Sequence, residues 1–298
     1  MLNWFRSAIK DKYAVDLGDL QGGFFSESLH EEVNENRNAI FWIVLSGGVP
    51  LLYANPFKSG YNMFEFFKKL LAGLNPANNP VFVGQQLKRP KGLFAAKVAD
   101  GMNVSNKNLY DLTFSNLDLK DGAHILEVGF GNGYFFKALS NKNSSVKLFG
   151  VEISKEMIRQ CEKLNKQLIA DHKLEVRYVS DSTLPYPDKY FEKAIAINLI
   201  YFWENPIENI EALHRVLKYQ GELYIGVRPF RILSQLPFAE NHFNIQQDEW
   251  WIDLFEKCGF ELISNKSAAE VPLQFNGSTY EMSGTCWVFK KSEVPLQG

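Results

Sequence analysis

The sequence is poor in cysteine. Its three cysteines, Cys161, Cys258 and Cys286, stand far apart, and no two of them form a C-x-x-C pair. An odd number of widely spaced cysteines indicates neither a disulfide framework nor a zinc site. We therefore expect no bound metal, thiols that pack as small apolar side chains, and a reducing, cytoplasmic location.

The chain also lacks an excess of charge of either sign and any apolar run of membrane-spanning length. Its formal net charge is −2, so it has no overall basic field to attract nucleic acid, and we expect no nucleic-acid partner. The most apolar stretch, residues 39–54, contains a Gly-Gly-Val-Pro sequence and is shorter than the roughly 20 residues of a spanning helix. Residues 1–12 mix charged and aromatic side chains, which is not the pattern of a signal peptide. We expect no membrane span.

The pattern of the chain changes along its length. Residues 1–62 show neither a period nor a chemical motif, and we interpret them as an extension of unknown role or as residues ahead of a true start at Met63. Residues 63–120 predict a helical entry segment. Its helices are expected at 63–71, 92–102 and 106–117, with Asn103-Val104-Ser105 separating the last two. A domain of alternating strands and helices over 121–291 and a tail at 292–298 complete the predicted organisation.

Apolar strands alternate with helices from residue 121 onward. Strands are predicted at 125–128, 146–151, 174–179, 193–197 and 221–227, and helices from Tyr134, from Ser154 to about Ala170, at 207–217 and at 248–258. On the second of these helices, Leu164 and Leu168 continue a helical period and should face the sheet. Two final strands, at 260–264 and 285–290, are expected to be joined by a long loop, and one of them should run antiparallel. We predict an α/β, Rossmann-like, doubly wound and mostly parallel seven-stranded sheet with an antiparallel strand near the C-terminus, preceded by a helical N-terminal segment.

Three glycines, Gly129, Gly131 and Gly133, follow the first predicted strand. Glycine lets the backbone approach a ligand closely and adopt positive φ, and the next helix offers unpaired N–H groups. A dinucleotide fingerprint needs a third glycine where this chain has Tyr134. Glu127, two residues before the first glycine, would repel a pyrophosphate but would suit an ammonium group. A tight strand-to-helix connection that binds nothing is the alternative interpretation of this turn.

Polar residues follow the next three strands. Glu152, which precedes Ile153, would accept hydrogen bonds from ribose hydroxyls unless it is a solvated strand-end charge. Asp181, beside Ser182, would accept from an adenine amino group unless it stabilises an Asx turn. Asn198 and Tyr201 come after the fourth strand, at the carboxyl edge where open α/β sheets bind ligands.

In this order, these segments resemble the class I S-adenosylmethionine-dependent methyltransferases of the small-molecule type, similar to methyltransferase types 11 and 25 and to a bacterial branch of that family. The resemblance covers about residues 84–290 and departs at Tyr219-Gln220, where the family has Pro-Gly. It implies that S-adenosyl-L-methionine is bound and that Asn198 lies near the donor methyl. The implied binding residues are Glu127, Gly129, Phe130, Gly131, Gly133, Glu152, Ile153, Asp181, Ser182 and Asn198.

The expected activity is methyl transfer to a small-molecule acceptor by in-line displacement, in which orientation supplies much of the rate and no dedicated catalytic group is required. His242 is a candidate for a general base, and Tyr201 is a candidate for a catalytic residue or a wall of the acceptor site, with loop and core roles as their alternatives. Trp203 is either part of that wall or core, and His214 is expected to pack. An NAD-type Rossmann oxidoreductase and a non-catalytic nucleoside-binding module remain alternatives. The acceptor and the oligomeric state stay open.

Overall fold

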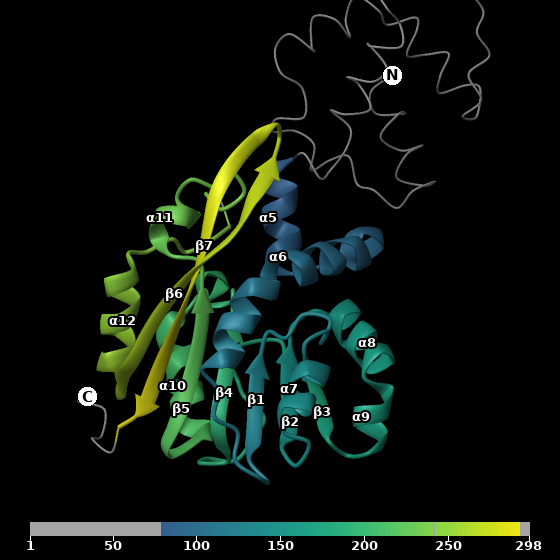
Figure 1. The fold of residues 1–298 in the computed structure, drawn as a ribbon, viewed down its shortest axis with the longest axis vertical. Coiled ribbons are helices and arrows are strands. Elements are labelled where there is room, and N and C mark those ends of the chain that lie inside the picture. Colours follow the sequence, from purple (N-terminus) through teal and green to yellow (C-terminus); the bar gives the residue numbers. More distant parts are fainter. Residues whose placement is uncertain (1–78, 241, 293–298) are drawn as a thin grey trace, which may run out of the picture. The chain divides into compact units, whose positions relative to one another are not determined.

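The computed structural model describes residues 79–240 and 242–292, which belong to the unit Pro80–Gly298 apart from Asn79 (Figure 1). The predicted extension at 1–62, the predicted helix at 63–71 and all of the predicted tail except Ser292 lie outside the described residues.

A seven-stranded sheet lies at the centre of this unit, in the order β3-β2-β1-β4-β5-β7-β6. Strands β1 to β5 pair in parallel, whereas β7 runs antiparallel to both of its neighbours, β5 and β6. The chain moves outward from β1 to β3 and then returns to place β4 beside β1, so the order reverses between β1 and β4. The strands are β1 His124–Val128, β2 Lys147–Glu152, β3 Leu174–Tyr178, β4 Phe191–Ile197, β5 Leu217–Val227, β6 Phe260–Phe275 and β7 Ser278–Lys291. The predicted fold class is confirmed.

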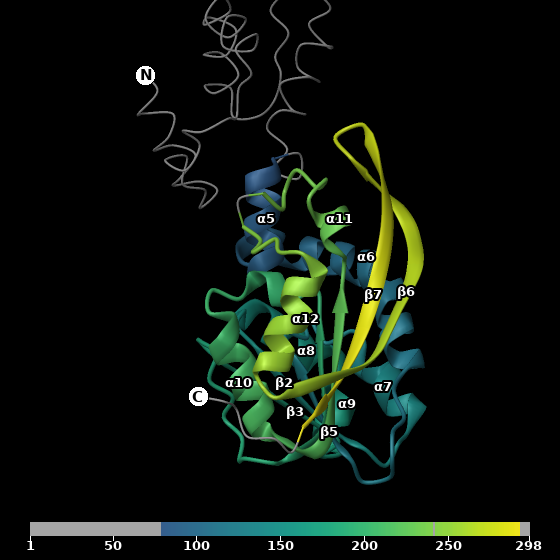
Figure 2. The same cartoon turned by 90° about the vertical axis from the view of Figure 1, so that its left-hand side faces the viewer.

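Helices cover both faces of the sheet, because successive side chains of each buried strand point to opposite sides. Ile125, Leu148 and Ile195 pack with residues of α6, α7 and α8, and the alternate positions pack with residues of α10 and α12 (Figures 1 and 2). The helices are α5 Pro80–Lys88, η3 Gly92–Phe94, α6 Ala95–Ser115, α7 Phe136–Lys142, α8 Lys155–Leu164, α9 Lys166–Ala170, η4 Ile200–Phe202, α10 Pro206–Val216, α11 Phe230–Leu233 and α12 Asp248–Lys257.

Helix α6 corrects the prediction of two helices separated at Asn103-Val104-Ser105. It is continuous from Ala95 to Ser115, with Val104 80% exposed. Asn, Val and Ser are only mildly unfavourable inside a helix, by up to about 0.7 kcal/mol each. Packing of the buried face, which includes Leu109 and Tyr110, outweighs that local preference.

Helix α8 begins as predicted and ends earlier. Ser154 is its N-cap, because its side chain accepts a hydrogen bond from the N–H of Met157. The helix ends at Leu164, because the side chain of Asn165 donates to the carbonyls of Gly133 and Cys161, and α9 follows as a separate turn. Leu164 is 41% exposed, so the prediction that it faces the sheet is wrong, whereas Leu168 packs against the core.

Strands β6 and β7 form a long hairpin where a long loop was predicted between two short strands. Asn276 and Gly277 make its two-residue turn with φ of 49° and 79°, the geometry of the type I′ turn that Asn-Gly favours. The hairpin extends past the carboxyl end of β5 in both views (Figures 1 and 2). Residues 265–269 of β6 are all exposed, so they lack the apolar alternation that would have predicted a strand.

The three cysteines are buried and free, as expected of small apolar side chains. Within residues 79–240 and 242–292, no helix combines the length and the apolarity needed to cross a membrane.

Candidate functional site

The glycine turn lies between β1 and α7, beside the point where the strand order reverses. All three glycines have positive φ, at 71°, 59° and 68°. A Cβ atom at Gly133 would lie 2.3 Å from Sγ of Cys161, whereas one at Gly131 would have no neighbour closer than Cε of Met102, at 4.0 Å. Gly133 is therefore required for packing against α8, and Gly131 leaves open space beside the turn where a ligand can approach the backbone.

The two aromatic residues of the turn have different surroundings. Phe130 is 3% exposed and packs against Phe136 with their ring centroids 5.2 Å apart. Only its backbone is therefore available to a ligand. Tyr134, which stands where a dinucleotide fingerprint needs a glycine, is 55% exposed and does not close the helix onto the sheet.

Glu127 is buried in β1, immediately before the turn. Its Oε1 accepts a 2.6 Å hydrogen bond from the hydroxyl of Tyr110. Burial raises the pKa of Glu127 to about 7 and the nearby Glu152 adds to this effect, while the hydrogen bond from Tyr110 opposes it. The ring of Tyr110 stacks on that of Phe135, with their centroids 3.7 Å apart. Nothing in the sequence around Tyr110 links it to a carboxylate 17 residues away, so it was not among the predicted site residues.

Glu152, at the end of β2, is held by the turn itself. Its Oε2 accepts from the N–H of Gly131 at 3.0 Å, and its Oε1 accepts from the N–H groups of Ile153 and Ser154. Burial raises its pKa to about 6, against these three hydrogen bonds. A carboxylate has about four lone-pair sites, so one remains. Glu152 can therefore accept a hydrogen bond from one ligand hydroxyl without any change. To accept from both hydroxyls of a ribose, it would have to release or share one of its three backbone N–H donors.

Asp181 and Ser182 lie in the loop after β3 and outside the buried part of this edge. Oδ1 of Asp181 accepts from the N–H of Thr183 at 2.8 Å, and Oδ2 accepts from the hydroxyl of Ser180 at 3.0 Å. These bonds lower the pKa of Asp181 and form the Asx turn that was the alternative interpretation. Ser182 donates to Glu208 at 3.2 Å.

Asn198 and Tyr201 are brought together after β4. Asn198 has a φ of 51°, its Oδ1 accepts from the hydroxyl of Tyr201, and its Nδ2 donates to Oδ1 of Asn106 at 2.9 Å. Tyr201 is 3% exposed and stacks on Phe243, with their ring centroids 5.1 Å apart. Burial raises its pKa well above the ordinary value, so its phenol is a hydrogen-bond donor at neutral pH.

An arginine that was not among the predicted site residues extends this cluster. Arg228, just after β5, donates from Nη1 to Oδ1 of Asn106 at 3.3 Å and from Nη2 to the carbonyl of Ser105 at 2.8 Å. Its Nε lies 3.1 Å from Oε2 of Glu270, which belongs to β6. The sequence predicted a break in the helix at residues 103–105. It therefore gave no reason to expect that Ser105 and Asn106 lie in one continuous helix beside Arg228.

The remaining predicted residues pack against other elements. The ring of His242 faces Gly84 of α5, where an added Cβ atom would come within 2.6 Å of Cδ2. His214 packs edge-on against Phe260, and burial lowers its pKa to about 4. Trp203 packs on Trp251 in the core, with ring centroids 6.3 Å apart. The core role of Trp203 and the packing role of His214 are confirmed. A catalytic role for His242 stays a prediction.

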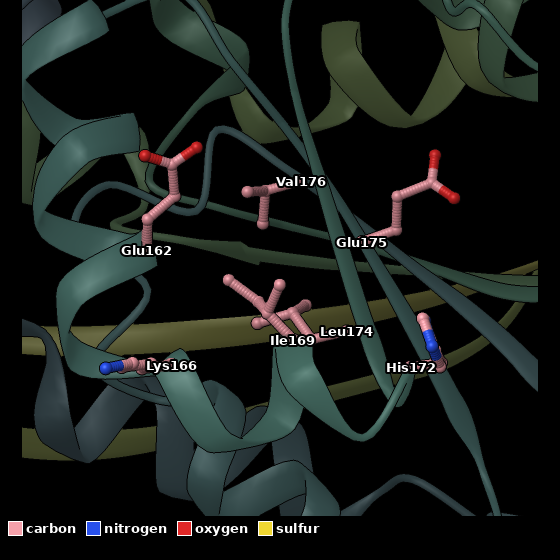
Figure 3. A pocket seen from close by; sticks show the side chains of 7 residues that line it. All are labelled: Glu162, Lys166, Ile169, His172, Leu174, Glu175 and Val176. Atoms are coloured by element: carbon pink, nitrogen blue, oxygen red, sulfur yellow. The ribbon is translucent and has the colours of Figure 1, made fainter.

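A surface pocket of about 470 Å³ lies elsewhere, between α8, α9 and β3 (Figure 3). Its lining includes Leu174, at the amino end of β3, and none of the residues described above; the full set is Glu162, Lys166, Ile169, His172, Leu174, Glu175 and Val176. The pocket therefore lies away from the carboxyl edge of the sheet. In the part of the chain that the structure describes, no group of three or more His, Cys, Asp or Glu residues could hold a metal ion.

The residues at this edge are similar to those of known methyltransferases. A model of the methyltransferase domain matches residues 126–225, which span the glycine turn, Glu152 and Asn198. This match supports a class I methyltransferase domain over these residues. The uncharacterized methyltransferase YdaC of Bacillus subtilis is 28% identical over 190 residues, covering 64% of this chain and 95% of that protein.

Other methyltransferases are similar over shorter stretches or in fold alone. A rice (Oryza sativa) 2-methyl-6-phytyl-1,4-hydroquinone methyltransferase is 28% identical over 151 residues, which are 49% of this chain and 43% of that protein. A chain from the complex between the Haloferax volcanii Trm112 methyltransferase activator and a methyltransferase superposes with a TM-score of 0.58 at 17% identity. That match covers 67% of this chain and 96% of the other, and it shows a shared fold.

Proposed function

We propose that this methyltransferase binds S-adenosylmethionine at the glycine turn and transfers its methyl group to a small-molecule acceptor by in-line displacement. The observation that carries the proposal is the buried carboxylate of Glu127 next to the open space at Gly131. An aminoacyl-bearing nucleoside brings an ammonium that this carboxylate would bind with a charge-assisted hydrogen bond.

The residues around the turn fit the rest of such a donor. Glu152 has lone-pair capacity for a ribose hydroxyl, and Asp181 offers exposed carboxylate oxygens at the end of the next strand. Gly129, Phe130 and Ile153 would contribute backbone contacts, and Ser182 would lie beside the base. Bound there, the donor would supply an electrophilic methyl, and the protein's part would be to orient the acceptor in line in a site from which water is excluded.

Two observations support a small acceptor. The chain has a formal net charge of −2, so no overall basic field favours nucleic acid. The rice relative is named for a hydroquinone, which is not a macromolecule. An oxidoreductase is disfavoured because the buried Glu127 would lie beside a dinucleotide pyrophosphate.

We also propose that residues 121–291 form the methyltransferase domain, with 63–120 as a helical entry segment, 1–62 as an extension of unknown role and 292–298 as a tail. Mass spectrometry of the protein from its source cells tests whether residues 1–62 belong to the native protein or whether it starts at Met63. Peptides from before Met63 would contradict a start at that residue.

Isothermal titration with S-adenosylmethionine, S-adenosylhomocysteine and NAD tests the donor. We expect both adenosyl ligands to bind, NAD not to bind, and Glu127→Gln to weaken both, with Glu281→Gln, an exposed carboxylate on β7, as the matched control. Binding of NAD without binding of S-adenosylhomocysteine would overturn the proposal in favour of the oxidoreductase. Binding of both adenosyl ligands without transfer to any compound of a metabolite extract would favour the non-catalytic module.

A further inference from the structure

Arg228 and Glu270 form an ion pair that is almost completely removed from solvent. Their side chains are 10% and 4% exposed, and Nε of Arg228 lies 3.1 Å from Oε2 of Glu270. Arg228 follows β5 at the carboxyl edge of the sheet, and Glu270 reaches this edge from the hairpin. Both residues lie beyond residue 225, where the match to the family model ends, so the shared domain pattern does not account for them.

The hairpin is built so that Glu270 points inward. The five residues before it in β6 are exposed, whereas its own side chain is buried. An irregularity in the pairing with β7 lies between Glu270 and Leu273, and bulges of this kind redirect a side chain. Gly284 on β7 leaves room for the carboxylate, because a Cβ atom there would lie 3.2 Å from Oε1 of Glu270.

The carboxylate of Glu270 lacks a hydrogen-bond donor among the described residues. Neither of its oxygens has a hydrogen-bond partner there, and the contact with Nε of Arg228 is an ion pair without hydrogen-bond geometry. A buried carboxylate oxygen without a hydrogen-bond donor carries a desolvation cost, even where an ion pair balances its charge. Burial raises the pKa of Glu270, while Arg228 lowers it. The arrangement suits a ligand that brings a donor to this carboxylate.

Arg228 connects this carboxylate to the residues where the methyl acceptor is expected. It donates to Oδ1 of Asn106, the same atom that accepts from Nδ2 of Asn198. Asn198 in turn accepts from the hydroxyl of Tyr201. Residues of α6, of the segment just after β5 and of β6 therefore meet the end of β4 in one network, on the edge that carries the glycine turn.

We infer that Glu270 binds the methyl acceptor through a neutral hydroxyl group of that acceptor, and that the product is a methyl ether. This inference rests on the proposed function. Arg228 already balances the charge of Glu270, so an ammonium would leave an excess positive charge in a buried site, and a carboxylate or phosphate would be repelled by Glu270. A hydroxyl supplies the missing donor without adding charge.

The transfer then balances without another reactant. The hydroxyl oxygen bonds to the methyl carbon as the carbon–sulfur bond breaks, its electron pair stays on sulfur, and the hydroxyl proton passes to Glu270. The carboxyl group returns that proton to water after the neutral thioether leaves. General-base assistance of this kind contributes about 10²–10⁴-fold to a rate.

The test uses the full chain, S-adenosylmethionine with a ¹³C-labelled methyl group, and a protein-free metabolite extract of the source organism. The ¹³C shift of the labelled product distinguishes methoxy carbons from N-methyl, C-methyl and methyl-ester carbons. Native protein is compared with Glu270→Gln, with Glu270→Asp, which keeps the carboxylate, and with the control Glu281→Gln. S-adenosylhomocysteine affinity and thermal midpoint are measured for all four proteins.

We expect a methyl ether from the native chain and from Glu281→Gln, a rate lower by about 10²-fold or more with Glu270→Gln, and a smaller loss with Glu270→Asp, all at unchanged S-adenosylhomocysteine affinity. An N-methyl, C-methyl or ester product would overturn the inference. Equal ether formation by Glu270→Gln, or equal losses in both variants accompanied by lower thermal midpoints, would assign Glu270 a structural role instead. Absence of S-adenosylhomocysteine binding by the native chain would refute the proposed function, and the inference with it.

Discussion

The hydroxyl of Tyr110 on α6 donates a 2.6 Å hydrogen bond to Oε1 of Glu127 at the end of β1. Both side chains are buried, and burial together with the Glu127 charge raises the pKa of the tyrosine well above its usual value. The phenol therefore stays protonated and supplies a fixed donor to the carboxylate. Helix α6 thus lowers the pKa of the group that we propose to bind the donor's ammonium, against the larger effect of burial.

Replacing Tyr110 with Phe removes this hydrogen bond while keeping the ring that stacks on Phe135. A hydrogen bond to a charged group contributes about 1.5–3 kcal/mol, and its loss would raise the pKa of Glu127 further and leave less carboxylate at neutral pH. We expect S-adenosylhomocysteine to bind about tenfold more weakly, measured by isothermal titration. Tyr134→Phe, which alters an exposed ring on the same turn, is the control, and equal affinities for the two variants would refute this role of Tyr110.

The free protein should lose stability as the pH rises from about 4.5 to about 7. The folded-state pKa values of Glu127 and Glu152 are raised to about 7 and about 6, above the ordinary value of 4.5. The folded state therefore binds more protons than the unfolded state in this window, and the stability that these protons provide, complete at low pH, disappears as pH passes through the folded pKa values. Thermal midpoints of the native chain and of Glu127→Gln across this window measure the effect. A steeper decline in the variant would contradict it.

Donor affinity should change in the opposite direction over the same pH range. An ammonium needs the ionised carboxylate of Glu127, so binding of S-adenosylhomocysteine should strengthen as pH rises through about 7. In Glu127→Gln the pH dependence around 7 should be lost. Titrations at several pH values measure both curves, and a parallel rise in the variant would show that another group is responsible.

Two glycines of the turn should respond differently to alanine. Gly133→Ala combines a left-handed φ, costing about 1–2 kcal/mol, with a Cβ atom 2.3 Å from Sγ of Cys161, for which overpacking adds about 1–3 kcal/mol. Gly131→Ala carries only the first cost, because nothing lies nearer than 4.0 Å, but its methyl enters the proposed ligand space. We expect unfolding experiments to rank Gly133→Ala lower in stability, and titration to show impaired S-adenosylhomocysteine binding by Gly131→Ala.

Gly101→Ala, at an exposed position inside α6 with no neighbour within 4 Å, is the matched control. It should stabilise the chain by about 1 kcal/mol, because alanine is the better helix former, and it should leave binding unchanged. If Gly131→Ala binds S-adenosylhomocysteine as well as the native chain does, the ligand does not lie on that side of the turn.

Asp181→Asn separates the two interpretations of Asp181. The amide oxygen of Asn can still accept from the N–H of Thr183, so the turn should persist and the thermal midpoint should stay the same. If Asp181 accepts from the adenine amino group, S-adenosylhomocysteine should bind more weakly in the variant than in Asp118→Asn, an exposed control before β1. Equal affinities would leave Asp181 with its turn role alone.

The alternation of strands and helices was readable along the chain, because buried parallel strands are short apolar runs bounded by glycine or by polar residues. The β6–β7 hairpin could not be predicted in the same way. Residues 265–269 of β6 are exposed and carry no alternating apolar pattern, although Asn276-Gly277 was a turn signal within the stretch taken as a loop. Glu270 was missed for the same reason.

Spacing and residue type along the chain were sufficient to select the glycine turn, the acid before it and the acid ending the next strand, because these groups lie on consecutive segments whose geometry is local. Only the tertiary structure decided that Tyr110 controls Glu127, that Gly133 serves packing while Gly131 leaves space, and that Arg228 meets Glu270. Those pairs join segments far apart in sequence, and a buried polar contact between distant segments leaves no periodic signal in either one. It exists only because burial makes an unpaired charge costly and the fold brings a partner within reach.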